Sequence, residues 1–192
     1  MNILAKIYIL ISYVQILFNK VYSTIRNAYL VSRGAHIGKN VKIGKRVRVI
    51  LEKNSHLKIM DNVEISDDCW IIVHEDSSLC IDEHVYISHH CVVSSNSKVD
   101  IGSYTAIGPY TIILDTDKNF KNPNEIIRKQ GSTSSPIIVA KDVWIGSFCV
   151  ITKGVEIGQH SVVAAHSVIT KDVKEFTLNA GVPSKLIYRI EE

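Results

Sequence analysis

Aliphatic residues return at every sixth position over residues 139–173, with mostly polar or small residues between them. A helix returns side chains to one face after about 3.6 residues and a strand after two, so neither element explains this period. One short strand and one corner in every six residues predicts a triangular prism, in which about eighteen residues complete a coil and stacked coils form a solenoid. The predicted inward residues are Val139, Ile145, Ile151, Ile157, Val163 and Ile169.

A second pattern has the same period. A slim residue stands four places after each inward residue, and we expect it to pack near a corner of the prism, where space is limited. Gly146 and Gly158 directly follow inward residues, and we predict that they supply the backbone freedom that a tight corner needs. The slim positions of this run are Val143, Cys149, Val155, Ser161, Ser167 and Val173.

The same repeat is present earlier in the chain, with interruptions. Each interruption falls on or after the third face of its coil, so the extra residues gather along one edge of the prism. Insertions on one side of a repeat array often mark a binding side. The pattern predicts an all-β solenoid of about six triangular coils over residues 34–174, whose first faces begin at Ile37, Ile59, Ile81, Ile101, Val139 and Ile157.

Two segments interrupt or follow the repeat. Residues 114–136 are polar and contain turn-forming pairs, and a loop of this length in a compact domain is usually either functional or disordered. We expect this loop to protrude and to contact another subunit. Residues 175–192 contain an Ala-Gly-Val-Pro turn followed by a short amphipathic stretch. We expect this tail to cap the last coil, since an uncovered strand edge invites aggregation.

Residues 1–33 differ in kind, because apolar residues recur there at helical spacing and acidic residues are absent. The pattern predicts an amphipathic helix. Its apolar run from Ile7 to Phe18 is too short to span a bilayer comfortably. Two interpretations stay open: residues 1–30 lie on the inner surface of the membrane, or the helix covers an open end of the solenoid or packs on a neighbouring subunit.

Composition narrows the function classes. The net charge of +3 is too small to indicate a nucleic-acid partner. The four cysteines show no CxxC spacing, so we predict neither a zinc site nor a disulfide framework, and no other metal is indicated. Cys69, Cys91 and Cys149 stand at slim corner positions. We expect a cytoplasmic protein, with peripheral contact at the inner face of the membrane if residues 1–30 bind lipid.

Three segments carry a family resemblance, namely KDVWIGSFCVITKGVEIG, SVVAAHSVITKDV and NAGVPSKLI. They are similar to segments of the galactoside, maltose and capsular-polysaccharide O-acetyltransferases, which belong to the hexapeptide-repeat acyltransferases. The resemblance is strongest over Val139–Arg189. It implies a left-handed parallel β-helix, a homotrimer with active sites between adjacent prisms, and acetyl-CoA as the acetyl donor.

The resemblance also implies donor-binding residues. Ser147 and Ala165 are small, so an extended ligand can run close to the backbone there. Lys171 and Lys185 can pair with phosphates, although lysines are otherwise ordinary solvated surface. Thr170 completes the set that the resemblance places against coenzyme A.

Acetyl transfer to a hydroxyl needs a general base. The family usually supplies a histidine in the loop that here spans residues 114–136, and this loop contains none. We predict that His90 replaces it, acting with Asp115, because adjacent coils lie about 4.8 Å apart and could bring both residues into one cleft. His89 and Asp117 are second candidates. The alternatives are exposed corner histidines and ordinary turn aspartates.

Several functions follow from these features. The first is an acetyl-CoA-dependent O-acetyltransferase that acts on a sugar hydroxyl in the biosynthesis of capsular or other cell-surface polysaccharide or lipopolysaccharide. The second is an N-acetyltransferase of an amino or nucleotide sugar, whose amine needs a weaker base. A serine-acetyltransferase-like enzyme is disfavoured by the missing loop histidine. The fourth is a catalytically silent trimeric scaffold that keeps the coenzyme-binding end.

Overall fold

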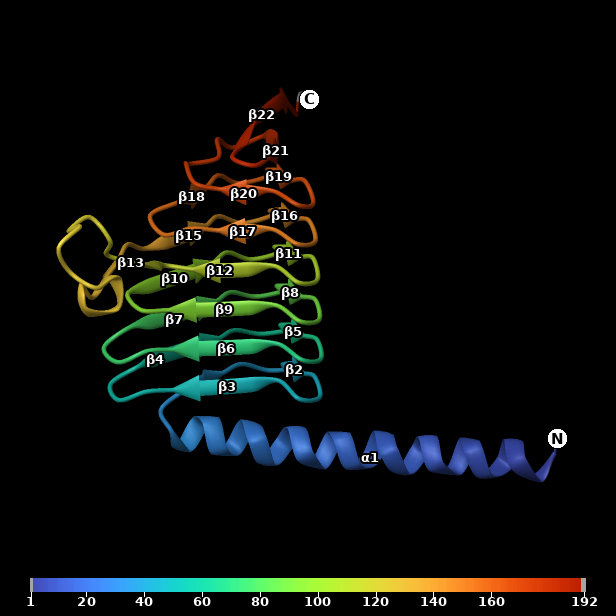
Figure 1. The fold of residues 1–192 in the computed structure, drawn as a ribbon. Helices are drawn as coiled ribbons and strands as arrows, with labels where there is room; N and C mark the ends of the chain where they lie inside the picture. The colour runs from blue at the N-terminus through green and yellow to red at the C-terminus, as the bar shows by residue number, and fades with distance from the viewer. Residues whose placement is uncertain (1, 191–192) are drawn as a thin grey trace.

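The structure, a computed structural model, describes residues 2–190, apart from the side chains of residues 19 and 20. An N-terminal helix is followed by a left-handed parallel β-helix of triangular coils (Figure 1). The predicted solenoid of about six coils is therefore confirmed. The first residue of the predicted helical segment and the last two of the predicted tail lie outside the described residues.

Three parallel sheets form the faces of the prism. The first sheet contains β1 (His36–Ile37), β4 (His56–Ile59), β7 (Ser78–Ile81), β10 (Lys98–Ile101), β15 (Ile137–Val139) and β18 (Glu156–Ile157). The second contains β2 (Lys42–Ile43), β5 (Glu64–Ile65), β8 (Tyr86–Ile87), β11 (Ala106–Ile107), β16 (Trp144–Ile145), β19 (Val162–Val163), β21 (Thr177–Gly181) and β22 (Ser184–Arg189). The third contains β3 (Arg48–Leu51), β6 (Trp70–Val73), β9 (Val92–Ser95), β12 (Ile112–Leu114), β17 (Val150–Ile151) and β20 (Val168–Ile169).

The core is a stack of inward aliphatic residues, one from each face of each coil. Ile59 is aligned with Ile37 on one side and with Ile81 on the other, which confirms the predicted coil register. Ile59 and Ile81 are fully buried. Burying a side chain of this size contributes about 1.5–3 kcal/mol, so the ladder of inward residues is the main source of stability in the prism.

Two positions of each corner are structurally constrained: the residue three places after the inward one, and the residue directly after it. The residue three places after the inward one adopts a left-handed backbone, as at His90 and Phe148 with φ of 58° and 57°. Gly146 and Gly158 do not adopt a left-handed backbone, so the prediction that they supply backbone freedom is wrong. A Cβ on Gly146 would lie 2.5 Å from the backbone nitrogen of Ala165. Glycine is required there because the next coil passes too close.

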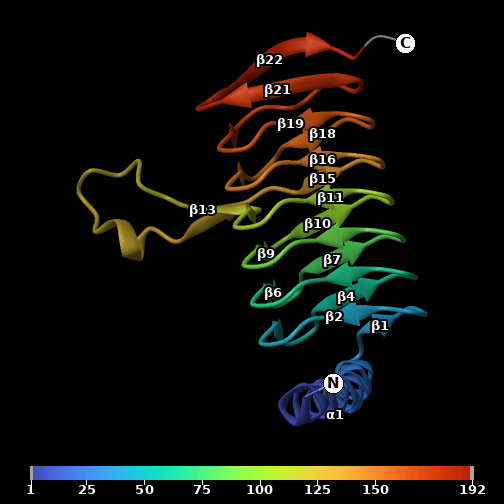
Figure 2. The ribbon, with the colours of Figure 1, turned by 90° about the vertical axis from the view of Figure 1, so that its right-hand side faces the viewer.

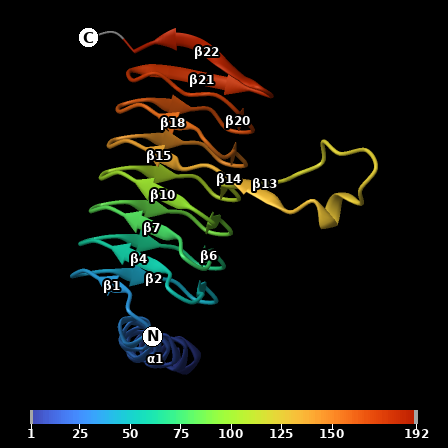
Figure 3. The ribbon, with the colours of Figure 1, turned by 90° about the vertical axis from the view of Figure 1, so that its left-hand side faces the viewer.

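We name the three edges of the prism by the sheets they join: the first edge joins sheets one and two, the second joins sheets two and three, and the third joins sheets three and one. The extra residues of the early coils all lie at the third edge, as predicted. The loop of residues 115–136 leaves the prism there and projects outward (Figure 2 and Figure 3). It contains the antiparallel strands β13 (Thr116–Lys118) and β14 (Ser132–Ser134) and the 3-10 helix η1 (Ile127–Lys129). Its contact with another subunit stays a prediction.

Helix α1 (Ile3–Ser32) lies across the base of the prism and extends beyond it (Figure 1). Leu30 is buried beneath the first coil. The Arg26 guanidinium donates hydrogen bonds to the carbonyls of Ile43 and Gly44. Most side chains over residues 3–18 are apolar and exposed, and Ser12 and Gln15 lie on one side of the helix, so its amphipathic character stays a prediction.

The C-terminal segment is a β-hairpin. Strand β21 pairs in parallel with β19, and β22 pairs antiparallel with β21. The predicted tail therefore extends the second sheet at its far end, where β22 covers the edge of β21.

Candidate functional site

A ladder of side chains follows the second edge, one from each coil. Each member stands three places after an inward residue and adopts a left-handed backbone, with φ between 54° and 63°. The left-handed backbone is sterically unfavourable for residues other than glycine, and the coil geometry imposes it here. We call this set the second-edge ladder: Arg46, Asp68, His90, Tyr110, Phe148 and His166.

Four members of the ladder are aromatic rings stacked face to face. The ring centroids of His90 and Tyr110 are 4.8 Å apart, those of Tyr110 and Phe148 4.8 Å, and those of Phe148 and His166 4.9 Å. These separations match the spacing of neighbouring strands, about 4.8 Å, so the coils themselves set the stacking. Because the ring faces contact one another, the ring edges remain for contact with a ligand.

The other end of the ladder is charged. Arg46 donates two hydrogen bonds to the Asp68 carboxylate, at 2.6 and 2.7 Å. His90 Nε2 lies 3.8 Å from Asp68 Oδ2. The hydrogen bond from Arg46 lowers the pKa of the Asp68 carboxyl, so an ionised carboxylate faces His90 at neutral pH. This carboxylate lies close enough to orient the imidazole.

An open groove of about 450 Å³ lies beside the charged end of the ladder. His89 contacts both His90 and Tyr110 edge to face. Lys42 and Glu64, which also line the groove, form an exposed ion pair with 3.3 Å between the Lys42 ammonium and the Glu64 carboxylate. The groove therefore presents hydrogen-bond donors and acceptors of both signs, which suits a polar ligand with several hydroxyl groups. Its lining also includes Gly44, Ser66, Asp67 and Asp68.

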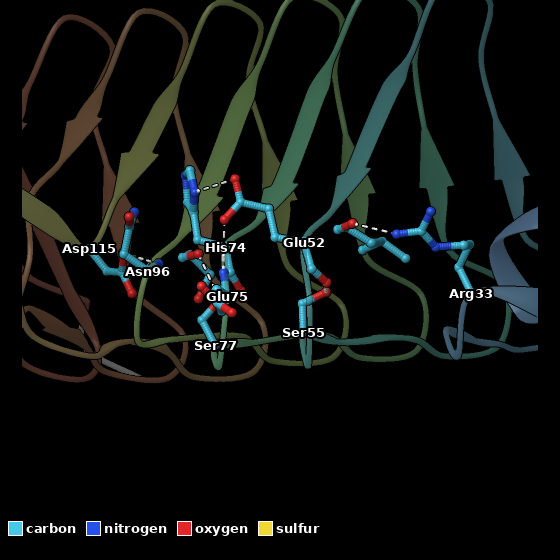
Figure 4. A network of polar contacts seen from close by, with 10 residues as sticks. Arg33, Glu52, Ser55, His74, Glu75, Ser77, Asn96 and Asp115 are labelled. Atoms are coloured by element: carbon cyan, nitrogen blue, oxygen red, sulfur yellow. Dashed lines mark hydrogen bonds and ion pairs between the residues drawn. The ribbon is translucent and has the colours of Figure 1, made fainter.

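The structure does not bring His90 and Asp115 together. The register of β9 and β12 places Asp115 beyond Leu114, which is aligned with Ser94, whereas His90 precedes β9 at its other end. Asp115 is fully buried and lies beside Asn96 (Figure 4). Its carboxylate accepts hydrogen bonds from the backbone N–H groups of residues 96, 97 and 98. The prediction that His90 and Asp115 share a cleft is wrong, because Asp115 is a buried cap of the third edge.

Asp117 lies on the protruding loop. Its carboxylate is 3.7 Å from the ammonium of Lys153, which also donates a hydrogen bond to the Thr133 carbonyl. Both side chains line a groove of about 520 Å³ under the loop. Asp117 is therefore accessible to a ligand, but within one chain it lies at the third edge and His90 at the second.

The predicted donor-binding residues form two groups. Lys171 and Lys185 line one pocket of about 230 Å³ beside the C-terminal hairpin, together with Lys174 and Arg189. Thr170 directly precedes Lys171 at the third edge. This concentration of cations suits phosphate groups.

The second group lies at the second edge. The backbone of Ala165 passes directly over Gly146, and the next residue, Ser147, accepts a backbone hydrogen bond from His166. The coils therefore hold Ser147 and Ala165 next to one another beside the ring ladder. One chain places the two groups at different edges of the third sheet, so a ligand that touches both must cross that sheet or bridge two copies.

Sequence reasoning missed several residues of these sites, notably Arg46, Asp68, Lys174 and Arg189. A signal for the ladder was available, since each member follows an inward residue by three places. The signal is hard to detect because chemically unrelated residues occupy the position. Lys174 and Arg189 join Lys171 only through the folding of the hairpin.

Comparisons with known proteins show which proteins this chain resembles. Residues 136–171 match the family model described as bacterial transferase hexapeptide (six repeats). The galactoside O-acetyltransferase of Escherichia coli (strain K12) is 33% identical over 117 residues, which cover 60% of this chain and 56% of that protein. The chain spans about half the length of the curated relatives it matches.

Solved structures extend the similarity over most of the fold. A polysialic acid O-acetyltransferase is 28% identical with a TM-score of 0.67, covering 81% of this chain and 74% of its own. A hexapeptide-repeat acetyltransferase of Vibrio cholerae O1 biovar eltor, crystallised with acetyl coenzyme A, is 25% identical with a TM-score of 0.58, covering 82% of this chain and 72% of its own.

Proposed function

Since this chain belongs to the hexapeptide-repeat acyltransferase family, we propose that it transfers an acetyl group from acetyl-CoA to a sugar hydroxyl. The observation that carries the proposal is the basic pocket at the far end of the prism, where Lys171 and Lys185 meet Lys174 and Arg189. A purely structural solenoid has no need of four cations around one cavity. The names of the related galactoside and polysialic acid O-acetyltransferases support a carbohydrate acceptor.

The donor fits a site built from two copies of the chain. Its phosphates pair with Lys171 and Lys185 of one copy, and its pantetheine arm runs past Ser147 and Ala165 of a neighbour. The small side chains at these two positions leave room for an extended ligand close to the backbone. Thr170 stands beside the phosphate group as a further hydroxyl donor.

The surface of the third sheet supports a homotrimer. An outward row there is apolar and partly exposed, whereas the equivalent row of the first sheet includes His36, Lys58, Asp100 and Glu156. A continuous apolar face of this kind is typical of a subunit interface. The row begins with Arg48, which is aligned with Trp70, and its apolar members are Trp70, Val92, Ile112, Val150 and Val168.

His90 is the proposed general base. Its imidazole takes the proton of the acceptor hydroxyl while the oxygen attacks the thioester carbonyl carbon. The C–S bond then breaks, and the departing thiolate of coenzyme A takes up a proton. Asp68, fixed by Arg46, positions the imidazole.

An N-acetyltransferase is the second candidate, and one observation favours it. Residues 114–136 contain no histidine, and an amine acceptor is already nucleophilic and needs less help from a base. Under this alternative His90 contributes little to the chemical step.

Turnover of acetyl-CoA tests these assignments. Release of free thiol is measured with a panel of neutral sugars and amino sugars, for the wild type, His90→Gln and His160→Gln. His160 is the matched control, because it also pairs with an aspartate, Asp142, at the first edge. We expect turnover with neutral sugars and a loss of about 10²–10⁴-fold for His90→Gln alone.

Other outcomes separate the alternatives. Turnover with amino sugars only, little changed in His90→Gln, would establish the N-acetyltransferase. Binding of coenzyme A without turnover for any acceptor would favour the silent scaffold and contradict the proposal.

A further inference from the structure

The outer half of helix α1 exposes apolar side chains over most of its circumference. Residues 7–11 are Ile, Tyr, Ile, Leu and Ile, and their exposed fractions lie between 41% and 73%. Successive helix residues are about 100° apart, so these five point in all directions around the axis, and only a narrow polar stripe with Ser12 and Gln15 interrupts the apolar surface. Ser12 turns its hydroxyl back to the Tyr8 carbonyl at 2.9 Å. Water is a poor environment for such a surface.

The helix meets the length and composition that a membrane environment requires. Among the described residues, one helix, Ile3–Ser32, is long and apolar enough to cross a membrane. Within it, residues 7–19 carry no charge, and Lys6 and Lys20 flank them. Lysines in such positions can extend their ammonium groups to the lipid headgroups.

Charge is distributed unevenly along the chain. The first 51 residues contain nine lysines and arginines and no aspartate or glutamate, whereas the remaining residues contain 13 basic and 19 acidic side chains. The positive charge therefore belongs to α1 and the first coil. In that coil the basic side chains are exposed: Lys39, Lys42, Lys45, Arg46 and Arg48.

The contacts of α1 bring the apolar helix and the basic coil to the same end of the molecule. Arg26 and the buried Leu30 hold the inner half of the helix against the first coil. The helix runs across the stacking direction of the coils, and it lies below β1 and β2 when viewed along its axis (Figure 1 and Figure 2). A flat surface that touches the helix along its length therefore also faces the first coil.

We propose that the base of the prism binds an anionic lipid bilayer. Residues 3–25 lie in the plane of the membrane with their side chains in the boundary between headgroups and acyl chains, and the cations of the first coil face the lipid phosphates. This arrangement accounts for both features. The hydrocarbon of the membrane buries the apolar side chains of the helix, and the anionic headgroups attract the basic side chains of the first coil. The His90 groove lies in the coils next to this surface, and the basic donor pocket lies at the far end.

The same features argue against a second copy of the chain as the occupant. Two bases brought together would bring their excess of basic side chains face to face, since among the described residues only Lys42 and Arg46 of the first coil pair with carboxylates, and like charges at an interface cost binding energy. An anionic membrane both buries the apolar side chains of the helix and carries the negative charge that the basic side chains of the first coil require.

The test is flotation of the purified full-length chain with vesicles of phosphatidylcholine alone and of phosphatidylcholine mixed with phosphatidylglycerol. We expect the protein to float with the anionic vesicles, and we expect added salt to weaken binding, because salt screens the attraction of exposed charges.

Two pairs of variants separate the apolar and the basic contributions. Leu10→Glu with Leu17→Glu places charge on the helix, and its control is Ile126→Glu with Ile127→Glu on the protruding loop, where both residues are also exposed. We expect at least a hundredfold loss of vesicle partitioning for the helix variant and none for the control. Circular dichroism verifies that each variant is folded.

The second pair removes charge. Lys39→Gln with Lys45→Gln is compared with Lys121→Gln and Lys129→Gln on the loop. Each basic residue near an anionic surface contributes about fivefold to partitioning, so the first variant should lose about 25-fold and the second should bind like the wild type. The assay involves no acetyl transfer, so its outcome is independent of the proposed function.

Three results would overturn the proposal. One is a wild-type protein that floats with neither kind of vesicle. Another is equal binding to neutral and anionic vesicles that is insensitive to Lys39→Gln with Lys45→Gln. The third is an oligomer in solution that dissociates in Leu10→Glu with Leu17→Glu while vesicle binding is absent, which would assign the helix to contact between copies.

Discussion

At the scale of single residues, Gly146 and Asp115 show how the stacking of the coils limits which residues can stand at the corners of the prism. The sequence predicted the inward and slim positions correctly, because burial selects for size and polarity, which a pattern displays. It did not predict why Gly146 is a glycine. The reason is that a Cβ on Gly146 would lie 2.5 Å from the backbone nitrogen of Ala165 in the next coil, and these two residues are far apart in the sequence.

Replacing Gly146 with alanine tests this contact. A Cβ there would push against the backbone of Ala165, and overpacking of this kind costs about 1–3 kcal/mol in the free energy of unfolding. The matched control is Ala164→Gly, at the same corner position one coil later, where we expect a loss below about 1 kcal/mol. Chemical denaturation measures both. Equal losses for the two variants would contradict the close approach.

Asp115 provides a second test at this scale. Its carboxylate accepts three backbone hydrogen bonds in a buried corner, so Asp115→Ala should lower the free energy of unfolding by about 3–5 kcal/mol. Asp117→Ala, two residues away on the exposed loop, should cost less than about 1 kcal/mol. If Asp115→Ala were as stable as the wild type but inactive, the residue would be catalytic after all.

At the scale of elements, the second-edge ladder links the coils through their side chains. The coil register was predictable from the inward residues, but the ladder was not, because His90, Tyr110 and Phe148 each look like an isolated surface residue in the sequence. The chemistry of the site depends on this register, which places Asp68 and not Asp115 beside His90.

Phe148 lies in the middle of the stacked rings. Phe148→Ala removes the contacts with Tyr110 and His166, and because aromatic pairs contribute about 0.5–1.5 kcal/mol each, we expect a loss of about 1–3 kcal/mol in the free energy of unfolding. Phe120→Ala, on the loop and 65% exposed, should change stability by less than about 0.5 kcal/mol. Thermal unfolding compares the two. A similar small change in both would show that the stack contributes nothing to stability.

At the scale of the whole molecule, the three faces and two ends of the prism differ in character. The sequence predicted the solenoid, the protruding loop and the distinct N-terminal segment, since each has its own periodicity. It could not predict which residues meet across edges, or that Lys174 and Arg189 would join Lys171. Those contacts depend on how the coils stack and how the last hairpin folds back.

The apolar row of the third sheet leads to a prediction about assembly. Val150→Glu should convert the proposed trimer to monomers, because a charge in the middle of an apolar interface loses its hydration without gaining a partner. Ile138→Glu, which faces outward from the first sheet, should leave the trimer intact. Light scattering of both variants gives the masses. A trimer that survives Val150→Glu would place the interface elsewhere.

The central claim is that the far end of the prism holds the acetyl donor, and titration calorimetry with coenzyme A tests it most directly. We expect the wild type to bind, and Lys171→Glu with Lys185→Glu to weaken binding at least tenfold, since charge-assisted contacts to phosphate contribute about 1.5–3 kcal/mol each. Lys121→Glu with Lys129→Glu, on the loop, is the control with the same change in charge. Unchanged affinity in the first variant, or an equal loss in the control, would contradict the claim.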